Sequence, residues 1–128
     1  MFSAVGLVIV ALSYGVAPSS VLPRILDLTV EGVDQTHVFR AIMGIYLGLV
    51  ALWVLGAYRS GFSRPAVIAE VFFMFGLACG RVISIVVDGM PSILLIGYTV
   101  VEITLGIWGI LVLKKLSTPQ IDTPTVRE

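Results

Sequence analysis

The sequence predicts an all-α integral membrane protein, a four-helix bundle with a short interfacial helix between the first and second spans. Hydrophobic residues make up 58% of the 128 residues and charged residues only 12%, and the mean hydropathy is +1.06. A soluble domain of this size needs more polar surface, because a small body has much surface for its volume. The apolar residues also gather into four segments separated by shorter polar ones.

These four segments are the expected membrane spans. Each of the last three approaches or exceeds the roughly 20 residues that cross a ~30 Å hydrocarbon layer. The first is shorter, but no Lys or Arg precedes its apolar stretch, and the residues after it are a poor match to a signal-peptide cleavage site. We therefore expect the first segment to be retained as a helix. The expected spans are residues 1–17, 37–57, 66–87 and 92–113.

The link between the first two spans has a helical pattern of its own. Over residues 21–34 the charged residues recur every three or four positions, and the apolar residues fall mostly on the opposite face. This pattern is typical of a short helix lying in the membrane interface. A helix that caps the bundle outside the membrane, or an irregular loop, is the alternative, and Gly32 weakens both helical interpretations.

The spans make up one membrane domain over residues 1–116, and a polar tail over 117–128 is expected to be disordered. Lys and Arg close to membrane spans concentrate on the cytoplasmic face. With four spans both termini share a side, so we expect both in the cytoplasm, in the inner membrane of a bacterium. Five basic residues lie on the side of the termini: Arg59, Arg64, Lys114, Lys115 and Arg127. Two lie on the other side: Arg24 and Arg40.

Charged residues inside the spans are the candidates for function. Charges at membrane depth are costly and normally face a partner or a water-filled cavity. Folding the last two spans back about the Asp88–Pro91 turn places Arg81 about one helical turn from Glu102. The long stem of an arginine covers that offset. We therefore expect an Arg81–Glu102 ion pair held by two parallel hydrogen bonds, whereas Glu70 lies near the opposite interface.

A polar funnel open to the acidic side is expected around this pair, where a ligand could bind. Its residues would be His37, Arg40, Arg81, Ser84, Asp88, Tyr98 and Glu102. Glycines spaced four apart let helices approach closely. The glycines expected at helix–helix contacts are Gly44, Gly48, Gly76, Gly80 and Gly106.

Three interpretations of the ion pair stay open: a structural pair that fixes the helix register, a pocket for a ligand, and a proton or ion relay. A buried pair is by itself weak evidence for stability. His37 and Asp34 alone do not make a metal site, and the single Cys79 excludes an intrachain disulfide.

Three stretches of the chain carry a family signal: "DQTHVFRAIMGIYLGL", "GRVISIVVDGMPS" and "YTVVEITLG". They resemble the small bacterial membrane proteins catalogued as domain of unknown function 4345, which are related in overall plan to four-helix DoxX-like membrane proteins. The resemblance runs from about Leu7 to Leu113, implies a four-span bundle and assigns no activity. The residues that match the family pattern include Thr36, Arg40, Gly44, Gly80, Arg81, Asp88, Gly89 and Glu102.

Several function classes remain on these grounds. One is a membrane protein that binds a lipid-like or anionic small molecule, and another is an accessory subunit of a larger membrane complex or a homo-oligomer. A small proton-coupled exporter fits less well, because such exporters carry a key glutamate in the first helix, where this chain has none. Zero net charge gives no sign of a nucleic-acid partner. The sequence contains no nucleophile–base arrangement, metal cluster or phosphate loop, so we expect no enzyme. It leaves any cofactor unknown.

Overall fold

The computed structural model describes residues 2–117, and in that range it contains five helices and no strand. The all-α prediction is therefore confirmed. The tail expected to be disordered lies, from residue 118 onward, outside the described residues. The helices are α1 (Phe2–Gly15), α2 (Pro18–Leu26), α3 (Gly32–Tyr58), α4 (Ser60–Asp88) and α5 (Ile93–Ser117).

Three of these helices, α3, α4 and α5, are long and apolar enough to cross a membrane. With 14 residues, α1 is about 21 Å long at 1.5 Å per residue, which is less than the ~30 Å hydrocarbon layer. Together α1 and α2 reach the length and composition of a span, but they are bent by 116° at the break between them. The chain is thus a small membrane protein with three spans, or four if the bent pair forms one.

The helix after the first span lies earlier than predicted, at Pro18–Leu26 instead of residues 21–34. Pro18 stands in the first turn, where a missing N–H costs nothing. Asp27 ends the helix with a left-handed backbone (φ 54°), and the following four residues are not helical. The helix α3 then begins at Gly32 (φ +78°). The charged residues that suggested one helix therefore belong to two helices and the link between them.

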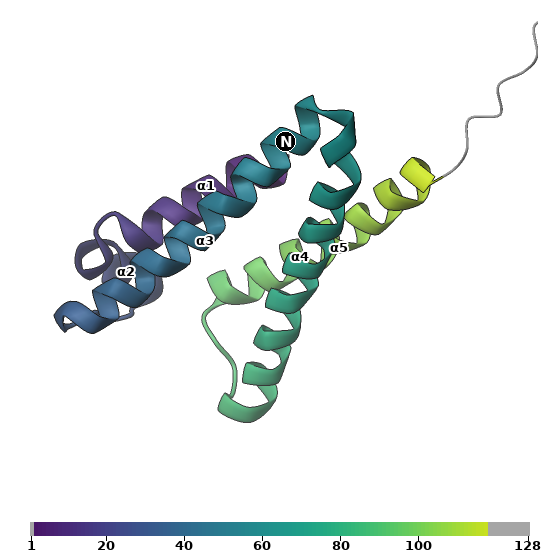
Figure 1. Cartoon of the computed structure of the whole chain (residues 1–128). Coiled ribbons are helices and arrows are strands. Elements are labelled where there is room, and N and C mark those ends of the chain that lie inside the picture. The colour runs from purple at the N-terminus through teal and green to yellow at the C-terminus, as the bar shows by residue number, and fades with distance from the viewer. Residues whose placement is uncertain (1, 118–128) are drawn as a thin grey trace, which may run out of the picture.

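The four longer helices form two pairs that are joined at one end and diverge from it (Figure 1). In one pair α1 lies along α3, and in the other α4 and α5 cross each other. Only Arg59 separates α3 from α4. This turn is tight because Gly56 packs directly against Ala66 and the Ser63 hydroxyl donates a hydrogen bond of 2.7 Å to the Gly56 carbonyl.

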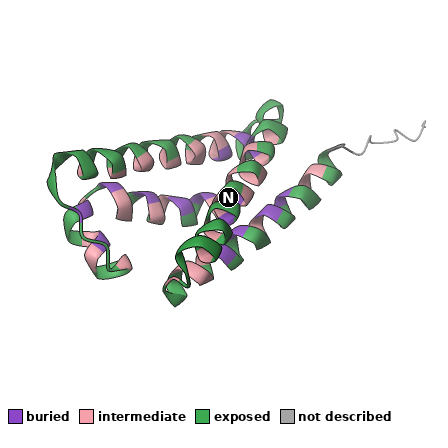
Figure 2. Ribbon diagram, turned by 90° about the horizontal axis from the view of Figure 1, so that it is seen from below, coloured by how far each residue is buried: buried purple, intermediate pink, exposed green. Residues whose placement is uncertain are grey.

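The apolar core lies near this joined end. Its buried residues come from the start of α1, the end of α3 and the first half of α4: Ala4, Leu7, Trp53, Ala66 and Met74. Buried positions lie along the inward sides of the helices, and exposed positions cover most of the outer surface (Figure 2). Many exposed side chains are large and apolar, such as Phe72 and Trp108, as expected for helices that are surrounded by lipid.

Four of the five glycines expected at helix contacts are exposed instead. A Cβ atom placed on Gly44, Gly48, Gly76 or Gly80 would meet no heavy atom within 4 Å, so the prediction of close packing there is wrong within this chain. At Gly106 it is right, because a Cβ there would lie 2.9 Å from the Phe75 ring. The spacing of glycines shows that they share a helix face, but not which helix covers that face.

Candidate functional site: an intramembrane cavity

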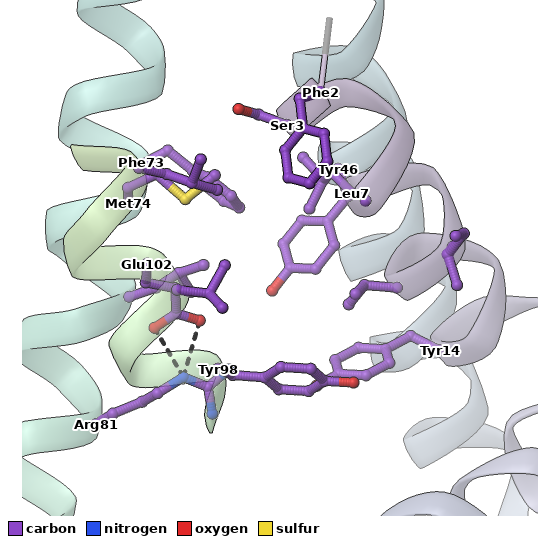
Figure 3. A pocket seen from close by; sticks show the side chains of 16 residues that line it. Phe2, Ser3, Leu7, Tyr14, Tyr46, Phe73, Met74, Arg81, Tyr98 and Glu102 are labelled. Carbon is purple, nitrogen blue, oxygen red and sulfur yellow. Dashed lines mark hydrogen bonds and ion pairs between the residues drawn. The ribbon is translucent and has the colours of Figure 1, made fainter. Parts of the chain in front are cut away.

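A cavity of about 310 Å³ lies between the two helix pairs. Ligand pockets in proteins usually measure roughly 300–1,000 Å³, so the cavity has the size of a small ligand site. Its lining is mostly apolar, and all four of the longer helices contribute to it (Figure 3). The polar residues that line it are Ser3, Tyr14, Tyr46, Arg81, Tyr98 and Glu102.

One wall of the cavity carries the predicted ion pair between Arg81 in α4 and Glu102 in α5. The Arg81 Nε donates to both carboxylate oxygens of Glu102, at 2.9 and 3.0 Å (Figure 3). The Glu102 side chain is 9% exposed and that of Arg81 is 24% exposed. The pairing is confirmed, but one nitrogen serves both oxygens where we expected two parallel bonds. The two terminal nitrogens of Arg81 are therefore not committed to Glu102.

The register of the α4–α5 hairpin produces this pairing. Gly89, with φ +100°, ends α4 in a backbone conformation that residues with side chains rarely adopt, and α5 returns alongside. The Cζ atom of Arg81 lies 5.6 Å from the centre of the Tyr98 ring, within the range of a cation–π contact. Arg81 is thus level with Tyr98, as the hairpin geometry predicted, and its guanidinium is fixed between an aromatic ring and a carboxylate.

The opposite wall carries two tyrosines, Tyr14 of α1 and Tyr46 of α3, which the sequence reasoning missed. Their ring centres are 6.1 Å apart. The Tyr46 hydroxyl points into the cavity (Figure 3), and the Tyr14 hydroxyl interacts electrostatically with Arg81. A tyrosine within an apolar span is itself a signal, because its hydroxyl needs a hydrogen-bond partner when it is buried.

A contact between Ser3 and Glu70 links α1 to α4. The Ser3 hydroxyl donates a hydrogen bond to the Glu70 carboxylate. Ser3 lines the cavity, whereas Glu70 is not among the lining residues. The N-terminal turn of α1, where Ser3 lies, is on the side of the joined end (Figure 1). Glu70 is therefore separate from the Arg81–Glu102 pair, as we expected, and it helps to hold α1 against the other helix pair.

The remaining residues of the predicted funnel do not line this cavity. His37 and Arg40 are exposed near the start of α3, where α3 lies apart from α4 (Figure 1). Their inclusion was wrong because it assumed that the helices pack together along their full length. Ser84 donates a 2.8 Å hydrogen bond to Asp88 on an exposed part of α4. Ser84 borders, together with Arg81, a separate hollow of about 60 Å³.

The chemistry that the cavity offers is hydrogen bonding in apolar surroundings. Arginine supplies N–H donors only, and a tyrosine hydroxyl can donate or accept. Among the described residues, no three His, Cys, Asp or Glu side chains come together as metal ligands would. The lining of the cavity therefore combines a few polar groups with a large apolar surface.

A family model with the description Domain of unknown function (DUF4345) matches residues 1–113. No curated protein and no solved structure matches the chain. The matched range contains every residue that lines the cavity.

Proposed function

Because the chain belongs to the family described as Domain of unknown function (DUF4345), a description that assigns no activity, we propose its function from the cavity alone. We propose that the protein binds a lipid-like or anionic small molecule between its two helix pairs. The observation that carries the proposal is the cavity of about 310 Å³ with Arg81 and Glu102 on its wall. In this proposal the protein binds its ligand and catalyses no reaction on it.

The polar groups of the cavity support a bound molecule. Polar and charged groups at membrane depth normally face a partner or a water-filled cavity. The terminal nitrogens of Arg81 and the hydroxyl of Tyr46 lie beside an otherwise apolar lining. A ligand with acceptor atoms at one end and an apolar body would satisfy these donors and fill the remaining space.

The position of the protein in the cell is part of the proposal. The excess of Lys and Arg on the side of the termini favours the inner membrane of a bacterium with both termini in the cytoplasm. The end at which the two helix pairs diverge, opposite the joined end, would then face the periplasmic side, next to α2. The similarity in overall helix arrangement to DoxX-like membrane proteins stays a prediction.

A second candidate function is an accessory subunit of a larger membrane complex or of a homo-oligomer. The exposed glycines of α3 and α4 favour it, since a helix of another chain could approach the backbone closely there. These glycines are Gly44, Gly48, Gly76 and Gly80. A role as an exporter has no comparable support.

Two matched glycine substitutions distinguish the two candidates. Gly6 lines the cavity and Gly76 lies on the exposed side of α4, and a Cβ at either position would meet nothing within 4 Å. Both Gly6→Leu and Gly76→Leu should therefore fold, because neither new side chain begins with a clash at its Cβ atom. Native mass spectrometry of the protein, expressed in a bacterial host and extracted in mild detergent, measures the bound lipid-like mass for each.

The wild type and Gly76→Leu should retain a bound molecule of lipid-like mass, and Gly6→Leu should lose it because leucine fills the cavity. If all three proteins carry the same adducts, the bound lipid lies elsewhere and the proposal is wrong. If no adduct is present and Gly76→Leu alone loses a stoichiometric companion chain, the accessory role replaces the binding role.

A further inference from the structure

The mouth of the cavity lies between α1 and α5. Among the lining residues, Phe2 and Ile9 of α1 are 84% and 66% exposed, and Val101 of α5 is 51% exposed. None of the lining residues from α3 or α4 is exposed. The mouth is therefore edged by apolar side chains of α1 and α5. Since α5 is long and apolar enough to span a membrane, this mouth suits a molecule that arrives from the hydrocarbon layer.

The charges inside the cavity balance each other. Arg81 contributes one positive charge, and Glu102, at 2.9 Å, contributes one negative charge. A bound anion would leave one net negative charge in a medium of low dielectric constant, where charges interact strongly and solvation is weak. The pair thus disfavours an anion, although an arginine considered alone would attract one.

Arg81 has N–H groups to spare for a further acceptor. Its Nε is occupied by Glu102 and the side chain also donates to the Tyr14 hydroxyl, but a guanidinium has five N–H groups, of which four are on the terminal nitrogens. On the opposite wall the Tyr46 hydroxyl points into the same space (Figure 3). A carbonyl, ester or ether oxygen can accept hydrogen bonds from both walls without bringing a charge.

From these three observations we infer that the ligand is an uncharged amphiphile with a hydrogen-bond-accepting head, which enters from the bilayer between α1 and α5. This inference rests on the proposed function and narrows its ligand class. The head lies between Arg81 and Tyr46, and the apolar body occupies the part of the cavity lined by Leu7, Phe73 and Leu105.

Three probes with the same sixteen-carbon chain test the inference on the full-length protein. Methyl palmitate has a neutral accepting head, palmitate at pH 8 has a charged head, and hexadecane has no head. Native mass spectrometry titrations in one detergent give the apparent Kd of each probe. Methyl palmitate should bind at least about tenfold more tightly than hexadecane, because a hydrogen bond to a charged donor is typically worth such a factor. It should also bind at least about tenfold more tightly than palmitate, because the carboxylate would leave one net negative charge in a medium of low dielectric constant.

Glu102→Gln supplies a second readout. Glutamine keeps an acceptor for the Arg81 Nε but removes the negative charge, so this variant should prefer palmitate to methyl palmitate. Thr104→Ala is the matched control on α5, because the Thr104 hydroxyl is exposed and bonds the Val100 carbonyl. It should keep the preference of the wild type.

The outcomes separate the inference from the proposed function. Tighter binding of palmitate than of methyl palmitate to the wild type overturns the neutral head and leaves the binding role intact. Equal binding of all three probes overturns the role of the donors. If no probe binds the wild type above the level of Gly6→Leu, the proposed function fails, and the inference fails with it.

Discussion

Replacing either member of the Arg81–Glu102 pair with leucine should destabilise the folded protein, and the two replacements should differ in size. Arg81→Leu leaves a carboxylate whose side chain is 9% exposed, whereas Glu102→Leu leaves a guanidinium that is 24% exposed and lies near the Tyr98 ring. A buried charge without its partner is the main cost in both cases. The remaining carboxylate is the more buried of the two and has no aromatic ring to stabilise it, so Arg81→Leu should cost more.

The magnitude follows from the burial of the pair. Breaking a buried pair by removing one partner costs about 3–5 kcal/mol of unfolding free energy. We expect Arg81→Leu near the upper end of that range and Glu102→Leu near the lower end. The double leucine variant leaves no unpaired charge, so its loss should be about 2–3 kcal/mol smaller than the sum of the single losses, in the range that directly contacting residues show.

The assay is a double-mutant cycle on the purified protein. Unfolding by sodium dodecyl sulfate in mixed micelles, followed by circular dichroism, gives the free energy of unfolding for each variant. Ser84→Ala is the control, since Ser84 lies on the same helix but is exposed and bonds only Asp88. Losses that add to within about 0.5 kcal/mol, or a larger loss for Glu102→Leu, would refute the reasoning.

Three further predictions concern packing, topology and processing. Gly106→Ala should destabilise the protein by about 1–3 kcal/mol, because the Phe75 ring must move away from the new methyl group, whereas Gly44→Ala, with open space, should be neutral or stabilising in the same unfolding assay. Reporter fusions after Val87 and after Leu113 should read periplasmic and cytoplasmic respectively, and the reverse pattern would contradict the orientation. The intact mass of the purified protein should include the first seventeen residues, and their absence would show that the first segment is cleaved.

The ion pair could be predicted from the sequence because it depends on local geometry. A short turn fixes the register of two adjacent helices, so the rise per residue is enough to bring Arg81 near Glu102. The cost of a charge at membrane depth then implies that the two residues meet. The all-α class follows in the same way from composition, and the structure confirms both.

The opposite wall of the cavity could not be predicted, because it depends on how two helix pairs are placed relative to each other. Periodicity shows which residues share a face, but it does not show that α3 diverges from α4. For that reason Arg40 was placed in the site and Tyr14 was not. The end of α2 was missed for a different reason: Asp27 adopts a left-handed backbone, which the charge pattern around it does not indicate.

The unequal lengths of the helices make the protein sensitive to hydrophobic mismatch. With 27 and 29 residues, α3 and α4 are roughly 40 Å and 44 Å long, and long helices match a thinner bilayer by tilting. The helix α1 is shorter than the hydrocarbon layer is thick, and the 116° bend between α1 and α2 prevents α1 from continuing across it. With α1 in the bilayer, as we propose, the lipids beside it must compress, and α1 forms one edge of the cavity mouth. We expect the ligand occupancy in nanodiscs to fall as the acyl chains of the surrounding lipids lengthen.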